Sequence, residues 1–183
     1  MQRRELIKMV ALLTGGSVIG ADLFLAGCKN RSANNNSNAD DIAFFDEVAE
    51  TIIPKTNTPG AKDAATGSFM TLYASDCYDE ASQKILKEGI SKINEASDKK
   101  FGATFMKINS TQKTELLTAI DKEAKEYAKQ NPASPHYFTL MKQLTLLGFF
   151  TSKPGATQVL RYNPVPGKYE GCIDYKKGEK SWF

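Results

Sequence analysis

Apolar residues recur with a helical period from Ile42 onward, and no segment alternates convincingly with the period of a strand. The pattern predicts five helices, each with an apolar stripe that faces a common core. In chain order the stripes are Phe45, Val48, Ala49 and Ile52; Phe69, Leu72 and Tyr73; Leu86, Gly89, Ile90 and Ile93; Leu117, Ile120, Ala124, Tyr127 and Ala128; and Leu140, Leu144, Leu147 and Phe150. The sequence therefore predicts a compact all-α domain of about five helices, with the fifth and most apolar helix at its centre.

Capping residues and prolines mark the ends of these helices. Pro54 stops the first helix, because its ring cannot follow a helical residue without strain. The other boundary signals are Asp40 and Asp41 before the first helix, Cys77 near the end of the second, Asp79 and Lys100 around the third, Asn109 or Ser110 before the fourth, and Gln130-Asn131-Pro132 after it.

The last segment, residues 161–183, has a different character. Its prolines and glycines break any regular element; they are Pro164, Pro166, Gly167, Gly171 and Gly178. Its aromatic residues are Tyr162, Tyr169, Tyr175, Trp182 and Phe183. Aromatic side chains in an irregular segment need a surface to bury against, which is either the chain's own helical domain or a partner, since Tyr and Trp are enriched at interfaces.

Composition and charge narrow the class of partner. The chain is 41% hydrophobic and 25% charged, which is typical of a globular domain and not of a disordered chain. Its net charge of +3 falls to +2 without the first 27 residues, which hold three basic and two acidic side chains. So small a charge gives no electrostatic footprint for nucleic acid, which we exclude as a partner.

The first 27 residues have the parts of a secretory signal. Arg3, Arg4 and Lys8 form a positive start, and the apolar run that follows is short and glycine-rich for a membrane-spanning helix. The sequence Leu-Ala-Gly-Cys that ends at Cys28 resembles a bacterial lipobox, in which cleavage leaves the cysteine as an acylated N-terminus. The alternative is an uncleaved anchor that ends at an incidental cysteine.

The positive start also resembles a twin-arginine export signal, an address that a receptor reads and that serves folded proteins. It departs from the usual pattern at Gln2 and Leu6, and the alternative is a chance pair of arginines in an ordinary basic region. Residues 28–41 are rich in Asn and Ser and predict a flexible tether. The predicted organisation is a signal at 1–27, a tether at 28–41 and a helical domain at 42–183, lipid-anchored to a bacterial membrane and facing the periplasm.

The predicted location determines how the three cysteines of the chain are expected to bond. If Cys28 is acylated, Cys77 and Cys172 remain in an oxidising compartment, and a disulfide between them is predicted. The alternatives are two free thiols or a bond from Cys172 to another chain.

Motifs for chemistry are missing from the sequence. It has no HExxH, CxxC or GxSxG, so the zinc, thioredoxin-like and hydrolase interpretations lack their residues. The single histidine, His136, stands before a predicted helix, where a surface or capping role is typical. We therefore predict no catalytic and no metal-binding residue in this chain.

Three stretches, taken together, resemble the gluconate 2-dehydrogenase subunit 3 family. They are TIIPKTNTPGA at 51–61, LGFFTS at 147–152 and PVPGKYEGC at 164–172. The resemblance spans most of the domain and implies the small, non-catalytic subunit of a membrane-associated dehydrogenase. It further implies a large partner subunit that carries FAD and oxidises a sugar, sugar acid or polyol, and in many cases a cytochrome c subunit.

The resemblance implies that the small subunit escorts a large subunit without a signal during export as a folded complex. A lipobox is a departure from the family pattern and leaves the electron acceptor open. The residues that we expect at the partner interface are Pro54, Thr58, Pro59, Gly60, Phe149, Phe150, Tyr162, Pro166, Gly167, Tyr169 and Trp182. For Phe149 and Phe150 the alternative is a place in the hydrophobic core. The alternative function is a stand-alone extracytoplasmic lipoprotein that binds a protein or a small ligand.

Overall fold

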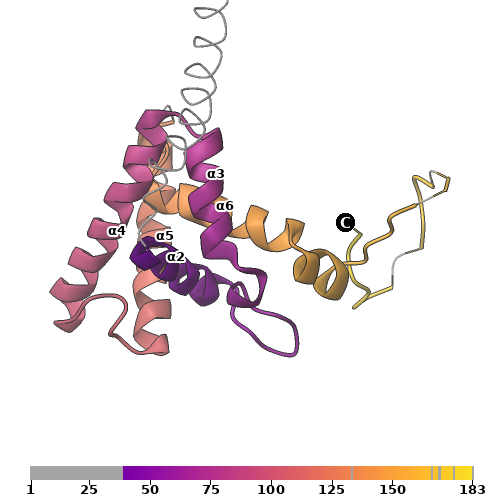
Figure 1. Cartoon of the computed structure of the whole chain (residues 1–183), viewed down its shortest axis with the longest axis horizontal. Helices are drawn as coiled ribbons and strands as arrows, with labels where there is room; N and C mark the ends of the chain where they lie inside the picture. The colour runs from indigo at the N-terminus through magenta and orange to yellow at the C-terminus, as the bar shows by residue number, and fades with distance from the viewer. Residues whose placement is uncertain (1–38, 133, 166, 169, 175, 183) are drawn as a thin grey trace, which may run out of the picture. The chain divides into compact units, whose positions relative to one another are not determined.

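A computed structural model describes residues 39–132, 134–165, 167–168, 170–174 and 176–182 of the chain (Figure 1). The predicted signal residues Arg3, Arg4 and Lys8 and the predicted lipidation site Cys28 lie outside the described residues, as do Pro166 and Tyr169. The export signal and the lipid anchor therefore stay predictions.

The described part of the chain contains five α-helices. They are α2 (Ala39–Ile52), α3 (Thr66–Cys77), α4 (Glu80–Phe101), α5 (Ser110–Gln130) and α6 (Tyr137–Thr151). A 3-10 turn, η1 (Lys62–Ala64), precedes α3, and a π-helical turn, η2 (Gly155–Val159), follows α6. The described residues form no strand, only an isolated bridge between Arg161 and Trp182. The predicted all-α fold is confirmed.

The predicted helix caps are confirmed at two helices. Asp79 accepts a hydrogen bond from the Ser82 amide at the start of α4. Asn109 and Gln112 form a reciprocal capping box at the start of α5. In contrast, α2 begins at Ala39, inside the segment that we predicted as a tether, and its first turn holds two acidic residues. Carboxylates in the first turn interact favourably with the helix dipole and so stabilise a helix that begins here.

The central position of α6 is also confirmed. It contacts α2, α3, α4, α5 and η2, and in Figure 1 it continues directly into η2 and the C-terminal segment. Its buried residues include Met141, Leu144 and Phe149, each at most 1% exposed. The predicted stripe is only partly right, since Leu147 is 40% exposed and Phe150 is half-buried.

The predicted face of α3 is only partly right, since Phe69 and Tyr73 are half-buried but Leu72 is not. Leu72 is 55% exposed, whereas the buried residues of this helix are Thr66, Gly67, Met70 and Ala74. Small residues on this face let α3 pack closely on α2, and the Gly67 amide donates a 2.7 Å hydrogen bond to the Asp46 carboxylate. A close helix contact built from small residues leaves little hydrophobic signal in the sequence.

Candidate partner interface

The first of the three stretches forms a loop, residues 54–61, which we call the Pro54 loop. The Glu50 carboxylate joins its two ends, because one oxygen accepts a 2.9 Å hydrogen bond from the Lys55 amide and the other accepts a 2.9 Å hydrogen bond from the Lys62 amide. Gly60 makes this contact possible. A Cβ atom at Gly60 would lie 2.5 Å from Glu50 Oε1 and 2.7 Å from the Lys55 amide nitrogen.

Asp63 holds the same loop from its other side. Its carboxylate forms a 3.0 Å ion pair with Lys55 and accepts a hydrogen bond from the Gly60 amide, and these two contacts lower the pKa of Asp63. The Ala61 amide also donates to the Ile53 carbonyl at 3.0 Å. The loop is therefore fixed by polar contacts, and it leaves Pro54 and Thr58 exposed, Pro59 half-buried and Gly60 buried.

A half-buried ion cluster anchors the loop to the helices. Glu47 pairs with Lys113 at 2.7 Å and also with Lys62. Burial opposes ionisation of Glu47, but the hydrogen bonds and charges of the two lysines outweigh it and lower the pKa of this carboxyl. The start of η1 is thus tied to α2 and α5 immediately beside the loop.

The second stretch forms the turn between α6 and η2. The Ser152 hydroxyl donates to the Phe149 carbonyl at 2.6 Å and accepts from the Gly155 amide at 3.1 Å. A Cβ atom at Gly155 would lie 1.9 Å from that carbonyl oxygen, so only glycine allows the chain to turn here. Phe149 is 1% exposed, so it belongs to the core and the prediction that it lies at an interface is wrong. Phe150 is half-buried against it, with ring centroids 5.2 Å apart.

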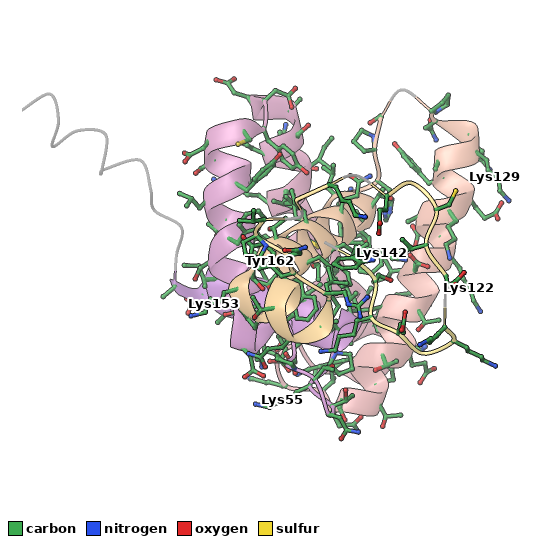
Figure 2. The ribbon with its side chains drawn as sticks, turned by 90° about the vertical axis from the view of Figure 1, so that its right-hand side faces the viewer. Lys55, Lys122, Lys129, Lys142, Lys153 and Tyr162 are labelled. Carbon is green, nitrogen blue, oxygen red and sulfur yellow. The ribbon has the colours of Figure 1, made fainter. Side chains whose placement is uncertain are left out.

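The Pro54 loop and the residues that directly follow the second stretch come together around an open groove of about 530 Å³. Its lining includes Lys55, Thr58 and Pro59 from the Pro54 loop and Lys153, Pro154 and Gln158 from the η2 turn. Figure 2 shows Lys55 and Lys153 on the same face of the molecule. Our sequence analysis missed Lys153 and Pro154, although the pair Pro154-Gly155, one residue after LGFFTS, signals a turn.

The third stretch lies in an irregular segment, residues 161–182, which we call the tail loop. Every described residue of the tail loop is exposed, including Gly167 and Trp182. Its two ends meet: the Arg161 amide donates a 2.8 Å hydrogen bond to the Ser181 carbonyl, and the Arg161 guanidinium lies 4.6 Å from the centre of the Trp182 ring. We call this contact the clasp. Lys180 adds a hydrogen bond to the Gln158 carbonyl in η2.

The predicted disulfide between Cys77 and Cys172 is wrong. Both cysteines are free and exposed. Cys77 ends α3, whereas Cys172 lies in the tail loop, whose hydrogen bonds and ion pairs join it to itself and to the end of η2. The number of cysteines left after acylation of Cys28 suggests a pair, but it carries no information on which surfaces the two thiols occupy.

A second group of titratable residues surrounds His136, which is the N-cap of α6 and accepts a 3.3 Å hydrogen bond from the Phe138 amide. Its ring lies 4.1 Å from the Tyr137 ring and 5.4 Å from the Tyr127 ring. Burial lowers the pKa of His136 and raises the pKa of Tyr137 to about 12. This cluster explains His136 as a buried cap, in agreement with the capping role that its position predicts.

None of the described helices has the length and apolarity needed to span a bilayer. Likewise, His, Cys, Asp and Glu side chains do not gather among the described residues in a group able to hold a metal ion.

The fold and the candidate site define an all-α subunit domain that presents an open groove and an exposed loop. Residues 39–167 match the model of the family described as gluconate 2-dehydrogenase subunit 3. This range is most of the chain, so the chain belongs to that family, which is named for a subunit of a dehydrogenase complex. Neither the comparison with curated proteins nor the comparison with solved structures gave a match.

Proposed function

We propose that this chain is the non-catalytic small subunit of a dehydrogenase complex, in which it escorts a large FAD-carrying subunit through export and holds it at a membrane. The substrate of the large subunit would be a sugar, sugar acid or polyol. The observation that carries the proposal is the family match over residues 39–167. FAD would be bound by the partner and not by this chain.

The surfaces described above support a role in assembly. The groove is open, and two of the side chains that line it, Lys55 and Asp63, form an ion pair that fixes the Pro54 loop. A rigid loop loses little conformational entropy when it docks, which favours recognition of another protein. Pro54 and Thr58 present the exposed part of this loop, and Lys153 faces the same groove.

The N-terminal sequence supports export and anchoring. Arg3, Arg4 and Lys8 precede an apolar run that ends at Cys28, the pattern of a twin-arginine lipoprotein signal. A partner without its own signal would then cross the membrane only as a folded complex with this chain. Acylation at Cys28 would hold the complex at the extracytoplasmic face, where a cytochrome c subunit is a possible further member.

Native co-purification tests the proposal. The full chain, tagged at its C-terminus, is isolated gently from membranes of its source organism, and the visible spectrum and subunit pattern are recorded. We expect a second, larger subunit with a flavin spectrum. A single colourless chain would contradict the proposal and favour a stand-alone binding lipoprotein.

Signal variants separate escort from simple association. We expect that replacement of Arg3 and Arg4 by lysine leaves both subunits inside the cytoplasm, because the receptor reads the arginine pair. Lys8→Gln changes the charge of the same region without touching the pair and serves as the control. A large subunit that still reaches the periplasm in the double variant would contradict the escort role, while leaving the complex itself intact.

A further inference from the structure

We infer that the tail loop, residues 161–182, is the segment that docks on another subunit of the complex, and that the surface it meets is apolar with a rim of carboxylates. The inference rests on the proposed function, since it names the part of this chain that meets its partner. It begins from a contrast in exposure, because the tail loop has no buried residue among those described.

Exposed apolar side chains are concentrated in the tail loop. Eight large hydrophobic residues are exposed in the described part of the chain, and four of them lie in this short segment. Their exposed fractions are 50% for Tyr162, 78% for Val165, 53% for Ile173 and 52% for Trp182. A short segment with this share of the exposed apolar side chains is a candidate site of interaction, whereas single apolar residues scattered over a surface are ordinary.

The clasp makes the tail loop fit for docking. Arg161, Ser181 and Trp182 join its ends, so the loop is held closed before any partner arrives. Closure removes part of the entropy that a free chain end would lose on binding. Trp, Tyr and Arg are also the residue types that contribute most to binding energy at protein interfaces.

The charges of the tail loop indicate the chemistry of its partner. The tail loop has a net charge of +2, because it holds five basic residues and three acidic ones. The basic residues are Arg161, Lys168, Lys176, Lys177 and Lys180, and the acidic residues are Glu170, Asp174 and Glu179. Carboxylates on the partner would complement this excess. A second copy of the chain would instead bring two positive loops together. Interspersed acids, such as Glu170 beside Lys168 at 2.6 Å, also distinguish the segment from the uniformly basic clusters that bind anionic lipid.

The two free cysteines provide the test, because each is exposed and they lie on different parts of the chain. Cys172 is in the tail loop, and Cys77 ends α3 outside it. A charged maleimide is added to the native flavin-containing complex and to the same chain stripped of its partner in detergent, and the modified peptides are mapped by mass spectrometry. We expect Cys172 to escape modification in the complex while Cys77 reacts as it does in the isolated chain.

Other results would overturn the inference. Equal modification of Cys172 in the complex and in the stripped chain would do so and would leave the proposed function standing, because the flavin is still present. Protection of Cys172 in the stripped chain on vesicles of phosphatidylglycerol and phosphatidylethanolamine would assign the loop to the membrane instead. Protection that accompanies dimerisation of the stripped chain would assign it to a second copy. A chain that never carries a flavoprotein would overturn the proposed function and the inference together.

A pair of matched variants gives an independent measurement. Ile173→Ser and Leu72→Ser each remove an aliphatic side chain that is just over half exposed, the first in the tail loop and the second on α3. We expect Ile173→Ser to lower the flavin recovered per chain by about tenfold, as for an interface residue worth more than 1 kcal/mol. Leu72→Ser should leave it unchanged. Equal flavin in both variants would count against the tail loop.

Discussion

The helical body, residues 39–160, and the tail loop that follows it are folded by different means. In the body, α6 buries Met141, Leu144 and Phe149 against the surrounding helices, and α3 buries its small residues against α2. The tail loop buries nothing that is described and is held at its base by the clasp. Apolar side chains in this chain therefore serve two purposes. The buried ones of the helical body build the fold, whereas those of the tail loop remain exposed at the surface.

The largest expected effect compares an aromatic residue from each region. Phe149→Ala should lower the free energy of unfolding of the detergent-solubilised full chain by about 3–5 kcal/mol, because it leaves a cavity in the core. Trp182→Ala should lower it by less than about 1 kcal/mol, the value of an exposed cation–π contact such as that with Arg161. Urea unfolding followed by circular dichroism measures both. Equal losses would mean that the tail loop is part of the cooperative fold.

An intermediate effect is expected at the Pro54 loop, which resembles the body in being tied down and the tail loop in being exposed. Glu50→Gln replaces one of the two carboxylate oxygens that hold the loop by an amide group that cannot accept. We expect about tenfold faster hydrogen exchange at whichever of the Lys55 and Lys62 amides loses its acceptor, equivalent to roughly 1.4 kcal/mol.

Glu88→Gln is the matched control, because Glu88 is exposed on α4 and its ion pair with Lys84 is long, at 3.9 Å. It should leave exchange in the loop unchanged. Exchange that rises equally in both variants, or in neither, would mean that Glu50 does not hold the loop.

The smallest expected effect is a pH dependence at the start of α6. Burial lowers the pKa of His136 below its ordinary 6.5, so the unfolded chain binds this proton more tightly than the folded chain does. Stability from this residue is therefore complete above about pH 6.5 and is lost as the pH falls through the folded pKa. Nearby, Glu123 acts against the shift and Lys92 adds to it.

His136→Asn isolates the pH-dependent stability contributed by His136, because asparagine retains an N-cap acceptor and does not titrate. His136 is the only histidine in the chain, so the melting temperature of the variant should change less than that of the wild type between about pH 7.5 and about pH 5.5. The carboxyls with lowered pKa values, such as Glu47 and Asp63, lose their contribution only at more acid pH. A wild-type and variant pair with identical pH profiles would contradict the role of His136.

Sequence reasoning succeeded where the determining interactions are local. The caps at Asp79 and Asn109 act within three residues, and the stripes of α4 and α5 follow from the helical period. It failed on part of the packed face of α3, because Gly67 and Ala74 carry little hydrophobic signal while the exposed Leu72 carries a strong one.

The candidate site was only partly predictable for a related reason. The first of the three stretches lies at the groove and the third lies in the tail loop, but the contacts that shape these sites are distant in the sequence. Glu50 reaches Lys62 across 12 positions, and the groove needs Lys153 and Pro154 beside the Pro54 loop. The closure of the tail loop depends on Arg161 meeting Trp182, and no local pattern announces a pairing of that kind.

The clasp has a consequence for how this subunit can evolve. Because Arg161 and Trp182 hold the two ends of the tail loop together, insertions and deletions between residues 162 and 179 leave this contact and the Lys180 hydrogen bond to η2 in place. Doubling the length of a closed flexible loop costs only about 0.6 kcal/mol. The tail loop can therefore change in length and sequence during evolution while the helical body stays the same.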